Sequence, residues 1–290
     1  MAVNNFIPTI WSARLLQNLH KTQVFGGLSN RDYEGEIAQA GDTVKIGGIG
    51  AVTVSDYTKN STSLSWQTLA DASQTLTIDQ AKYFAFKVDD VDRAQTKPDL
   101  MDEAMREAAY ALSDEIDGYI AALYGSAATA NKVGSDGSAV TVGYGSGETD
   151  PYHQLVDMGT KLTVANVPQA GRWAVVPPWF EGMLRKNANF VANPASGSGE
   201  SVVTNGLIGR VANFDIYVSN NVTDNGSGVY RCMFGSRMAI SLAVQKQPQM
   251  EAIRLQDSFA DGVRGLLLYG AKVVRPAALA VLFADEGANA

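Results

Sequence analysis

Cysteine and histidine are nearly missing from this 290-residue sequence, which has one cysteine, Cys232, and two histidines, His20 and His153. A single cysteine excludes an intrachain disulfide framework and a cysteine-rich zinc site, and the distant histidines exclude an HExxH zinc helix. Cys232 lies in a strand-like run, Tyr-Arg-Cys-Met-Phe, so we expect a buried, unreactive thiol. His153 lies near a predicted helix start, where a surface or interface position is expected.

The common catalytic and phosphate-binding motifs are also missing. The sequence contains no GxxxxGK(S/T), GxGxxG or GxSxG pattern, which excludes the usual phosphate cradles and the nucleophile elbow. A Ser-His-Asp triad stays open, because its members need only meet in space. The carboxylates of Asp89, Asp90 and Asp92 fit no known metal-binding loop, so an acidic patch is favoured over a metal site. We therefore predict a protein that is not an enzyme and uses no cofactor or metal.

Positive charge and long apolar runs are scarce. Lys and Arg number 23 against 30 Asp and Glu, a formal net charge of −7, so a uniformly basic nucleic-acid-binding surface is not expected. The apolar runs fall short of the roughly 20 residues that a membrane-spanning helix needs. The first residues, Met-Ala-Val-Asn-Asn, do not resemble a signal peptide, so we expect synthesis in the cytoplasm and no membrane association.

Residues 1–33 are predicted to form an arm ahead of the main domain. Trp11, Leu15 and Leu19 recur every four residues, which predicts one apolar stripe on an amphipathic helix, and Gly26-Gly27 is expected to end the helical pattern. A single short helix cannot bury such a stripe by itself. The stripe therefore packs either on its own domain or on a neighbouring subunit, and both alternatives stay open.

Residues 34–88 are predicted to form a long two-stranded β excursion. Apolar and polar residues alternate around Val44 and Ile46, and strand signals return up to Val88. The stretch between them contains Lys59 and Trp66 but few large apolar residues for its length. Since isolated hairpins are only marginally stable in water, this excursion should pack against something else.

Residues 96–124 have the clearest helix signal, with a capping box and apolar residues at three- and four-residue spacing. From Asp99 to Tyr124 the other face carries a single basic residue, Arg106, and seven carboxylates: Asp99, Asp102, Glu103, Glu107, Asp114, Glu115 and Asp117. A charge run is usually a solvated face. The size of the imbalance keeps a second alternative open, in which Asp102 and Glu103 contact basic groups of a neighbouring subunit.

The rest of the chain mixes helix and strand signals. Residues 125–150 are rich in glycine, serine and alanine and predict a loop or irregular β structure, and Asp150-Pro151 predicts the start of a helix over 151–164. Strands are predicted at 172–176, 214–218, 230–234, 238–244 and within 263–283. This mixture predicts an α+β fold.

Five segments resemble, in the same order, parts of the major capsid proteins of tailed bacteriophages. They are Phe6–Leu16, Asn30–Gly35, Gly41–Ile46, Phe86–Gln95 and Gly265–Pro276. The resemblance covers almost the whole chain, and its weight lies in the shared order, since no single motif is diagnostic. Within these proteins the chain resembles the P22-coat-like group, which has the HK97 fold.

The resemblance implies an HK97-like capsid fold with an extended β-hairpin E-loop, a long spine helix in the P-domain and an A-domain with a central sheet. The implied boundaries are 1–33 for the N-arm, 34–88 for the E-loop, 89–125 for the P-domain spine helix, 126–245 for the A-domain, and 246–290 for a returning segment that completes the P-domain and the central sheet.

The same resemblance implies a coat protein that assembles into hexamers and pentamers of an icosahedral shell. The shell would enclose phage double-stranded DNA without sequence-specific binding, and assembly would take place in the host cytoplasm. Because the arm begins at Phe6, scaffolding would come from a separate protein or be unnecessary, and a portal is a further implied partner. The subunit-interface candidates are Trp11, Leu15, Leu19, Lys59, Trp66, Asp102 and Glu103.

The sequence departs from the family in two respects, and three alternative functions stay open. The chain has no segment long enough for the insertion domain of the P22 coat protein, and Lys59 has no recognisable cross-linking partners, so no isopeptide cross-link is predicted. An encapsulin-like nanocompartment would keep the fold and change the cargo. A soluble enzyme with glycine-rich active-site loops is a second alternative, and a secreted β-rich adhesin is the weakest.

Overall fold

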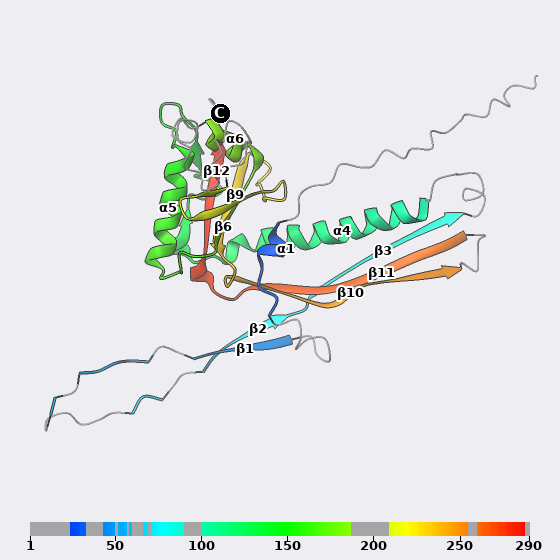
Figure 1. The fold of residues 1–290 in the computed structure, drawn as a ribbon, viewed down its shortest axis with the longest axis horizontal. Coiled ribbons are helices and arrows are strands. Elements are labelled where there is room, and N and C mark those ends of the chain that lie inside the picture. The colour runs from blue at the N-terminus through cyan, green and yellow to red at the C-terminus, as the bar shows by residue number, and fades with distance from the viewer. Residues whose placement is uncertain are drawn as a thin grey trace, which may run out of the picture.

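The computed structural model describes residues 24–32, 43–49, 52–56, 58–59, 66–68, 71–89, 100–186, 209–254 and 260–287. They form an elongated molecule with three parts (Figure 1). A compact unit surrounds a seven-stranded sheet, a long helix lies along a three-stranded sheet, and a two-stranded hairpin projects from the junction of the other two parts.

The elements follow one another in a mixed α and β order. The helices are α1 (Phe25–Leu28), α4 (Leu100–Ala122), α5 (Pro151–Val164) and α6 (Pro178–Lys186), with 3-10 turns η1 (Leu123–Ser126), η2 (Thr129–Asn131) and η3 (Pro276–Ala278). The strands are β1 (Thr43–Ile49), β2 (Asp71–Thr77), β3 (Gln80–Asp89), β4 (Lys132–Val133), β5 (Val140–Val142), β6 (Arg172–Val176), β7 (Arg210–Val211), β8 (Phe214–Val218), β9 (Val229–Ser236), β10 (Ile240–Arg254), β11 (Ala260–Val273) and β12 (Leu279–Glu286).

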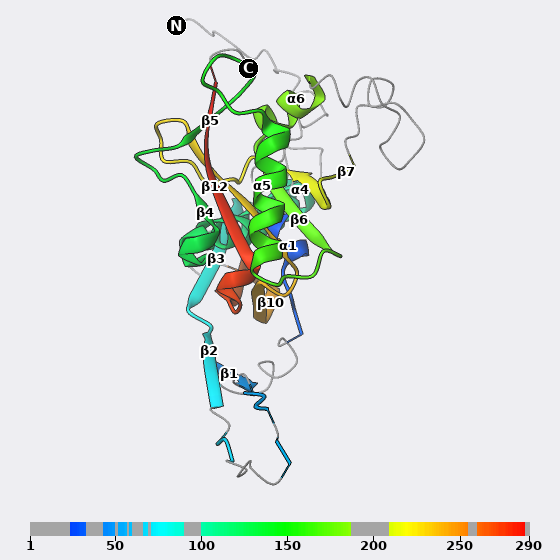
Figure 2. The same ribbon diagram turned by 90° about the vertical axis from the view of Figure 1, so that its left-hand side faces the viewer.

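The compact unit is built on a sheet in the order β4-β12-β9-β6-β8-β7, with β5 also paired to β12. Strands β6 and β12 are nearly continuous apolar runs that are buried on both faces, as expected for central strands. Helix α5 lies along the sheet (Figure 2). It begins at Asp150, whose carboxylate accepts a hydrogen bond from the Tyr152 amide at 2.7 Å, and Pro151 occupies the first turn.

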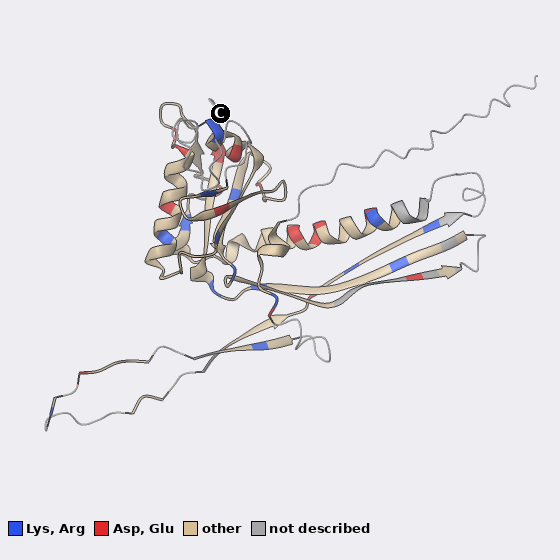
Figure 3. Ribbon diagram, viewed as in Figure 1, with Lys and Arg blue, Asp and Glu red and all other residues tan. Residues whose placement is uncertain are grey.

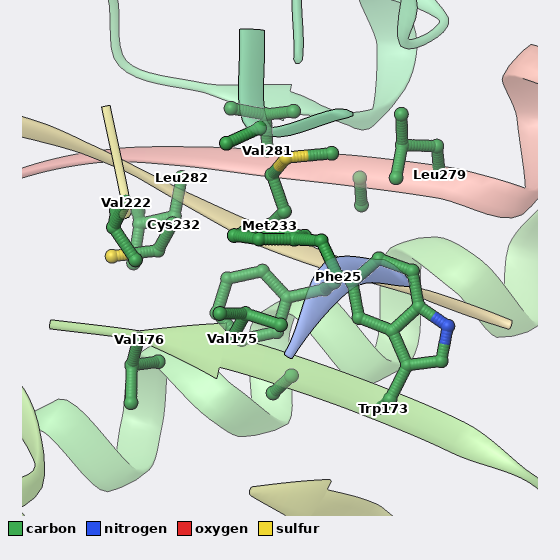
Figure 4. Close-up of a cluster of buried hydrophobic side chains, with 14 of the residues drawn as sticks. Phe25, Trp173, Val175, Val176, Val222, Cys232, Met233, Leu279, Val281 and Leu282 are labelled. Carbon is green, nitrogen blue, oxygen red and sulfur yellow. The ribbon is translucent and has the colours of Figure 1, made fainter. Parts of the chain in front are cut away.

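The core of the compact unit contains a side chain from the N-terminal part of the sequence. Figure 4 shows Phe25 of α1 among Trp173 of β6, Met233 of β9 and Val281 of β12. Phe25 is only 1% exposed. The beginning of the described chain is therefore part of this core.

The elongated part consists of α4 packed on the sheet β10-β11-β3. Side chains alternate along β3: Lys82 and Phe84 are partly buried, whereas Tyr83 and Ala85 are exposed, as the two faces of a pleated strand require. The rings of Tyr119 in α4 and Tyr269 in β11 meet edge to face with centroids 5.6 Å apart. One face of this sheet is thus covered by α4 and the other is open to solvent.

The predicted elements are largely found, with one correction. Helix 151–164 and strands 172–176 and 214–218 have the predicted ends, and the long helix runs from Leu100 to Ala122 before the 3-10 turn η1. The β excursion is different, because β1 pairs only with β2, up to Thr77, and Gln80–Asp89 pairs with β11. The prediction that the return strand of the hairpin extends to Val88 is therefore wrong. Gly26 and Gly27 lie inside the short helix α1, and the arm helix that they were expected to end lies outside the described residues.

Candidate assembly surfaces

The projecting hairpin carries an exposed apolar tip. Trp66 and Val54 are each 93% exposed and Val52 is 65% exposed, while Thr53 and Gln67 join the two sides through a 2.8 Å hydrogen bond from the Thr53 amide. Lys59 lies in a turn and is also exposed. Large apolar side chains that stand singly in solvent are common, but three on one extended ribbon indicate a contact surface.

The base of the hairpin, by contrast, is anchored. Leu76 is fully buried and packs with Val44 and with Ala243 of β10. Lys272 of β11 donates a 2.8 Å hydrogen bond to the Thr75 carbonyl oxygen. The hairpin therefore projects from a fixed base in a defined direction and leaves its tip uncovered by the described part of the chain.

A second apolar surface lies on the open face of the sheet β10-β11-β3. Tyr83 is 78% exposed, and its register partner in β11 is Leu266, which is also exposed. A depression of about 450 Å³ is lined by both residues, by Ala85 and by the ion pair between Arg264 and Glu251. Sequence reasoning missed this face because it assigned Tyr83 to the hairpin, although the alternation along β3 was visible.

The acidic helix is partly neutralised within the chain. Figure 3 shows acidic positions in the half of α4 nearer the compact unit. Glu115 forms a 2.8 Å ion pair with Lys82, Asp114 accepts a 2.6 Å hydrogen bond from Asn221, and Asp117 is buried. These carboxylates are therefore not a plain solvated face.

Four of the predicted interface residues can be compared only in part with the structure. Lys59 and Trp66 both lie on the hairpin, as described above. Asp102 and Glu103 lie in the first turn of α4, where the structure describes only the helical backbone. The apolar stripe of Trp11, Leu15 and Leu19 lies outside the described residues. These interface assignments stay predictions.

The structure offers little catalytic chemistry in the part that it describes. Cys232 is buried, as predicted, and burial raises the pKa of its thiol well above the usual range. His153 is exposed on α5. Within the described ranges no three His, Cys, Asp or Glu side chains are placed to hold a metal ion, and no described helix is long and apolar enough to cross a membrane. Asp90 and Asp92 lie outside these ranges.

A polar depression of about 390 Å³ lies between α4, β3 and β11. Tyr119 and Tyr269 line it, and burial is the first cause that raises the pKa of each phenol, with Asp79 and Glu115 adding negative charge nearby. Phenols held in the neutral form are hydrogen-bonding groups, not nucleophiles. The residues that line this depression are therefore better explained by the packing of α4 on the sheet than by a catalytic site.

A family model described as phage capsid protein matches residues 71–282. The chain belongs to this family. A solved structure from Mycobacterium phage Che8 is 33% identical with a TM-score of 0.76, and the match covers 97% of this chain and 98% of that one. The fold is also similar to the capsid structure of cyanophage P-SCSP1u, at 17% identity and a TM-score of 0.78, with 97% and 94% covered. A comparison with curated proteins found no match.

The capsid protein thus has the HK97-like fold that the sequence predicted, and its role is that of a major structural subunit of the icosahedral phage shell, located in the virion capsid. The projecting hairpin and the helix along a sheet agree with the expected E-loop and spine helix. Assignment to the P22-coat-like group stays a prediction.

Proposed function

We propose that this capsid protein builds hexamers and pentamers in which the hairpin tip of one subunit packs on the open sheet face of the next. The hairpin, which carries Val52, Val54 and Trp66, and the sheet β10-β11-β3, which carries Tyr83 and Leu266, extend in opposite directions from the junction of the three parts (Figure 1). One subunit cannot bury either surface against the other by itself. This separation is the observation that carries the proposal.

Two different complementary surfaces on one chain produce head-to-tail contacts. Such heterologous interfaces close into rings when the rotation between neighbours permits it, which fits hexamers and pentamers. In this proposal the E-loop, P-domain, A-domain and N-arm have the boundaries predicted above, with two exceptions: β3 belongs to the sheet of the P-domain, and residues 24–30 of the predicted N-arm are packed on the compact unit and β10. The subunit has a structural role without catalysis.

The remaining partners belong to the same proposal. The shell is assembled in the host cytoplasm with a separate scaffolding protein and a portal, and it encloses double-stranded DNA without reading its sequence. The formal net charge of −7 supports this, because a strongly basic lining would bind DNA and hinder its packing and release.

Trp66→Ser and Tyr83→Ser test the contact between tip and sheet face. Each change removes an exposed ring, so we expect folded subunits that fail to form shells in electron micrographs and in light scattering. Val164→Ser is the matched control, because Val164 is 78% exposed but lies at the end of α5. Shells of normal size and yield from both ring variants would overturn the proposed contact. A wild-type protein that stays monomeric at every concentration would overturn the assembly function itself.

A further inference from the structure

The first described residues form a short strap, defined here as Val24–Asn30, which lies across the junction of the three parts. Phe25 is inserted in the core of the compact unit (Figure 4). At the other end of the strap, the Asn30 amide donates to the Ile240 carbonyl oxygen and the Leu242 amide donates to the Asn30 carbonyl oxygen, both at 2.9 Å. The strap is therefore joined to the compact unit and to β10.

A buried carboxylate of α4 makes the third attachment. Oδ1 of Asp117 accepts hydrogen bonds from the amides of Val24 and Gly26, each at 3.1 Å, and the residue is only 1% exposed. Its Oδ2 accepts a 3.2 Å hydrogen bond from Nδ2 of Asn221, in the turn after β8. A carboxylate is buried at a large cost unless such donors surround it, and hydrogen bonds to an ionised group are the stronger kind.

The strap cannot hold this position through its own sequence. Helix α1 has four residues, Phe-Gly-Gly-Leu, which is far below the length at which a helix is stable alone, and glycine is a poor helix former. Phe25 fixes how deeply the strap is inserted. The two amides bound by Asp117 fix the orientation of its first turn, and thus the position at which residues 1–23 join the subunit.

We propose that Asp117 is a positioning residue for assembly: it holds the strap so that the N-arm starts from one place and in one direction, toward a neighbouring subunit. This inference rests on the proposed function, because it assigns the arm a partner in the shell. A strap that is docked for only a fraction of the time would lower the apparent affinity of assembly by that fraction.

Three variants separate positioning from simple stabilisation of the fold. Asp117→Ala removes the acceptor of both strap amides. Asp117→Asn keeps Oδ1 as the acceptor for those amides, but it places an NH2 group opposite the Nδ2 donor of Asn221. Asn221→Ala removes the hydrogen bond between these two side chains by removing its donor. The last two variants therefore disturb the junction of α4 and the compact unit while the strap keeps its acceptor.

The measurements are the assembled fraction, the melting temperature of the unassembled subunit and amide exchange in peptides that contain Val24–Asn30. We expect these amides to exchange fast in Asp117→Ala, and we expect this variant to need about tenfold more subunit to reach the same assembled fraction, as for a strap docked a tenth of the time. Asp117→Asn and Asn221→Ala should keep protected strap amides and near-normal assembly, even where they melt earlier.

The opposite results are equally clear. Assembly that follows the melting temperature across all three variants would mean that Asp117 only supports the fold, and normal shells from Asp117→Ala would overturn the proposal. Should Asp117→Ala not fold, Asp117→Glu keeps the charge but displaces it by one methylene, so it must also reduce assembly. A wild-type chain that forms no shells would instead remove the proposed function.

Discussion

Gly270 of β11 lies so close to Thr77 that a Cβ atom at position 270 would stand 2.2 Å from the Thr77 carbonyl oxygen. This approach, together with the hydrogen bond from Lys272 to the Thr75 carbonyl oxygen at 2.8 Å, fixes the base of the hairpin against the sheet. Backbone atoms cannot move aside as a flexible side chain can. The direction in which the hairpin projects therefore depends on the missing side chain at position 270.

Gly270→Ala should push the base of the hairpin away from β11. Inserting a methyl group into such a contact usually costs about 1–3 kcal/mol, which should appear as a lower midpoint in urea unfolding of the unassembled subunit. A displaced hairpin should also reduce shell yield. Gly118→Ala is the control, because a Cβ there meets nothing within 4 Å, and alanine within the C-terminal half of α4 should add up to about 1 kcal/mol of stability. Equal stability of the two variants would contradict the close approach.

Tyr269 should make the subunit less stable in alkaline solution. Burial, helped by Glu115, Tyr119 and Asp79, raises the pKa of its phenol from 10.0 to about 12 in the folded chain. Between these pH values the unfolded chain loses the phenolic proton while the folded chain keeps it, so stability falls as pH rises from 10 to 12. Tyr269→Phe should show a smaller loss of unfolding free energy over that interval. The same pH slope in both proteins would disprove this assignment.

Deleting residues 1–22 should leave a folded subunit that does not assemble. The deletion removes Trp11, Leu15 and Leu19 but keeps Phe25 and the strap in the core. If the stripe is buried on another chain, loss of Trp11 alone costs ~3 kcal/mol or more of association, and the melting curve followed by circular dichroism stays nearly unchanged. A large drop in melting temperature would show instead that the arm packs on its own subunit.

Local signals predicted the elements whose causes are local. Helix α5 has the predicted ends because Asp150 caps it and Pro151 occupies its first turn. Strand β6 has the predicted ends because its run of apolar residues is continuous. The family resemblance added the overall fold. The pairing of strands that are distant in the sequence was harder to predict. Strand β3 directly follows the hairpin in sequence, but its partner β11 begins at Ala260.

The glycines of the strap show the same limit. Gly26-Gly27 has the sequence of a helix end, yet both residues are helical because Asp117, 91 positions from Gly26, accepts the amides of the first turn. The acidic helix likewise looked solvated or intermolecular, because neither Asn221 nor Lys82 is near α4 in sequence. In each case, a contact partner distant in the chain decided the local structure.

The remaining acidic positions of the long helix should affect assembly through salt. Asp114, Glu115 and Asp117 already have partners in their own chain, so Asp102 and Glu103, in the first turn of α4, are the better candidates for contacts between subunits. The predicted arm, residues 1–33, has complementary charge in Arg14, Lys21 and Arg31 against Asp32.

Exposed ion pairs contribute only about 0–1 kcal/mol each and are screened over roughly 8–10 Å at physiological salt, but a shell repeats each pair in every subunit. We therefore expect Asp102→Asn with Glu103→Gln to change the salt dependence of assembly, followed by light scattering from low to high salt, while the melting temperature of the subunit stays nearly the same. Glu115→Gln is the matched control, because its partner is Lys82 in the same chain. Assembly curves of the double variant and the wild type that coincide at every salt concentration would leave the first turn of α4 as a solvated surface.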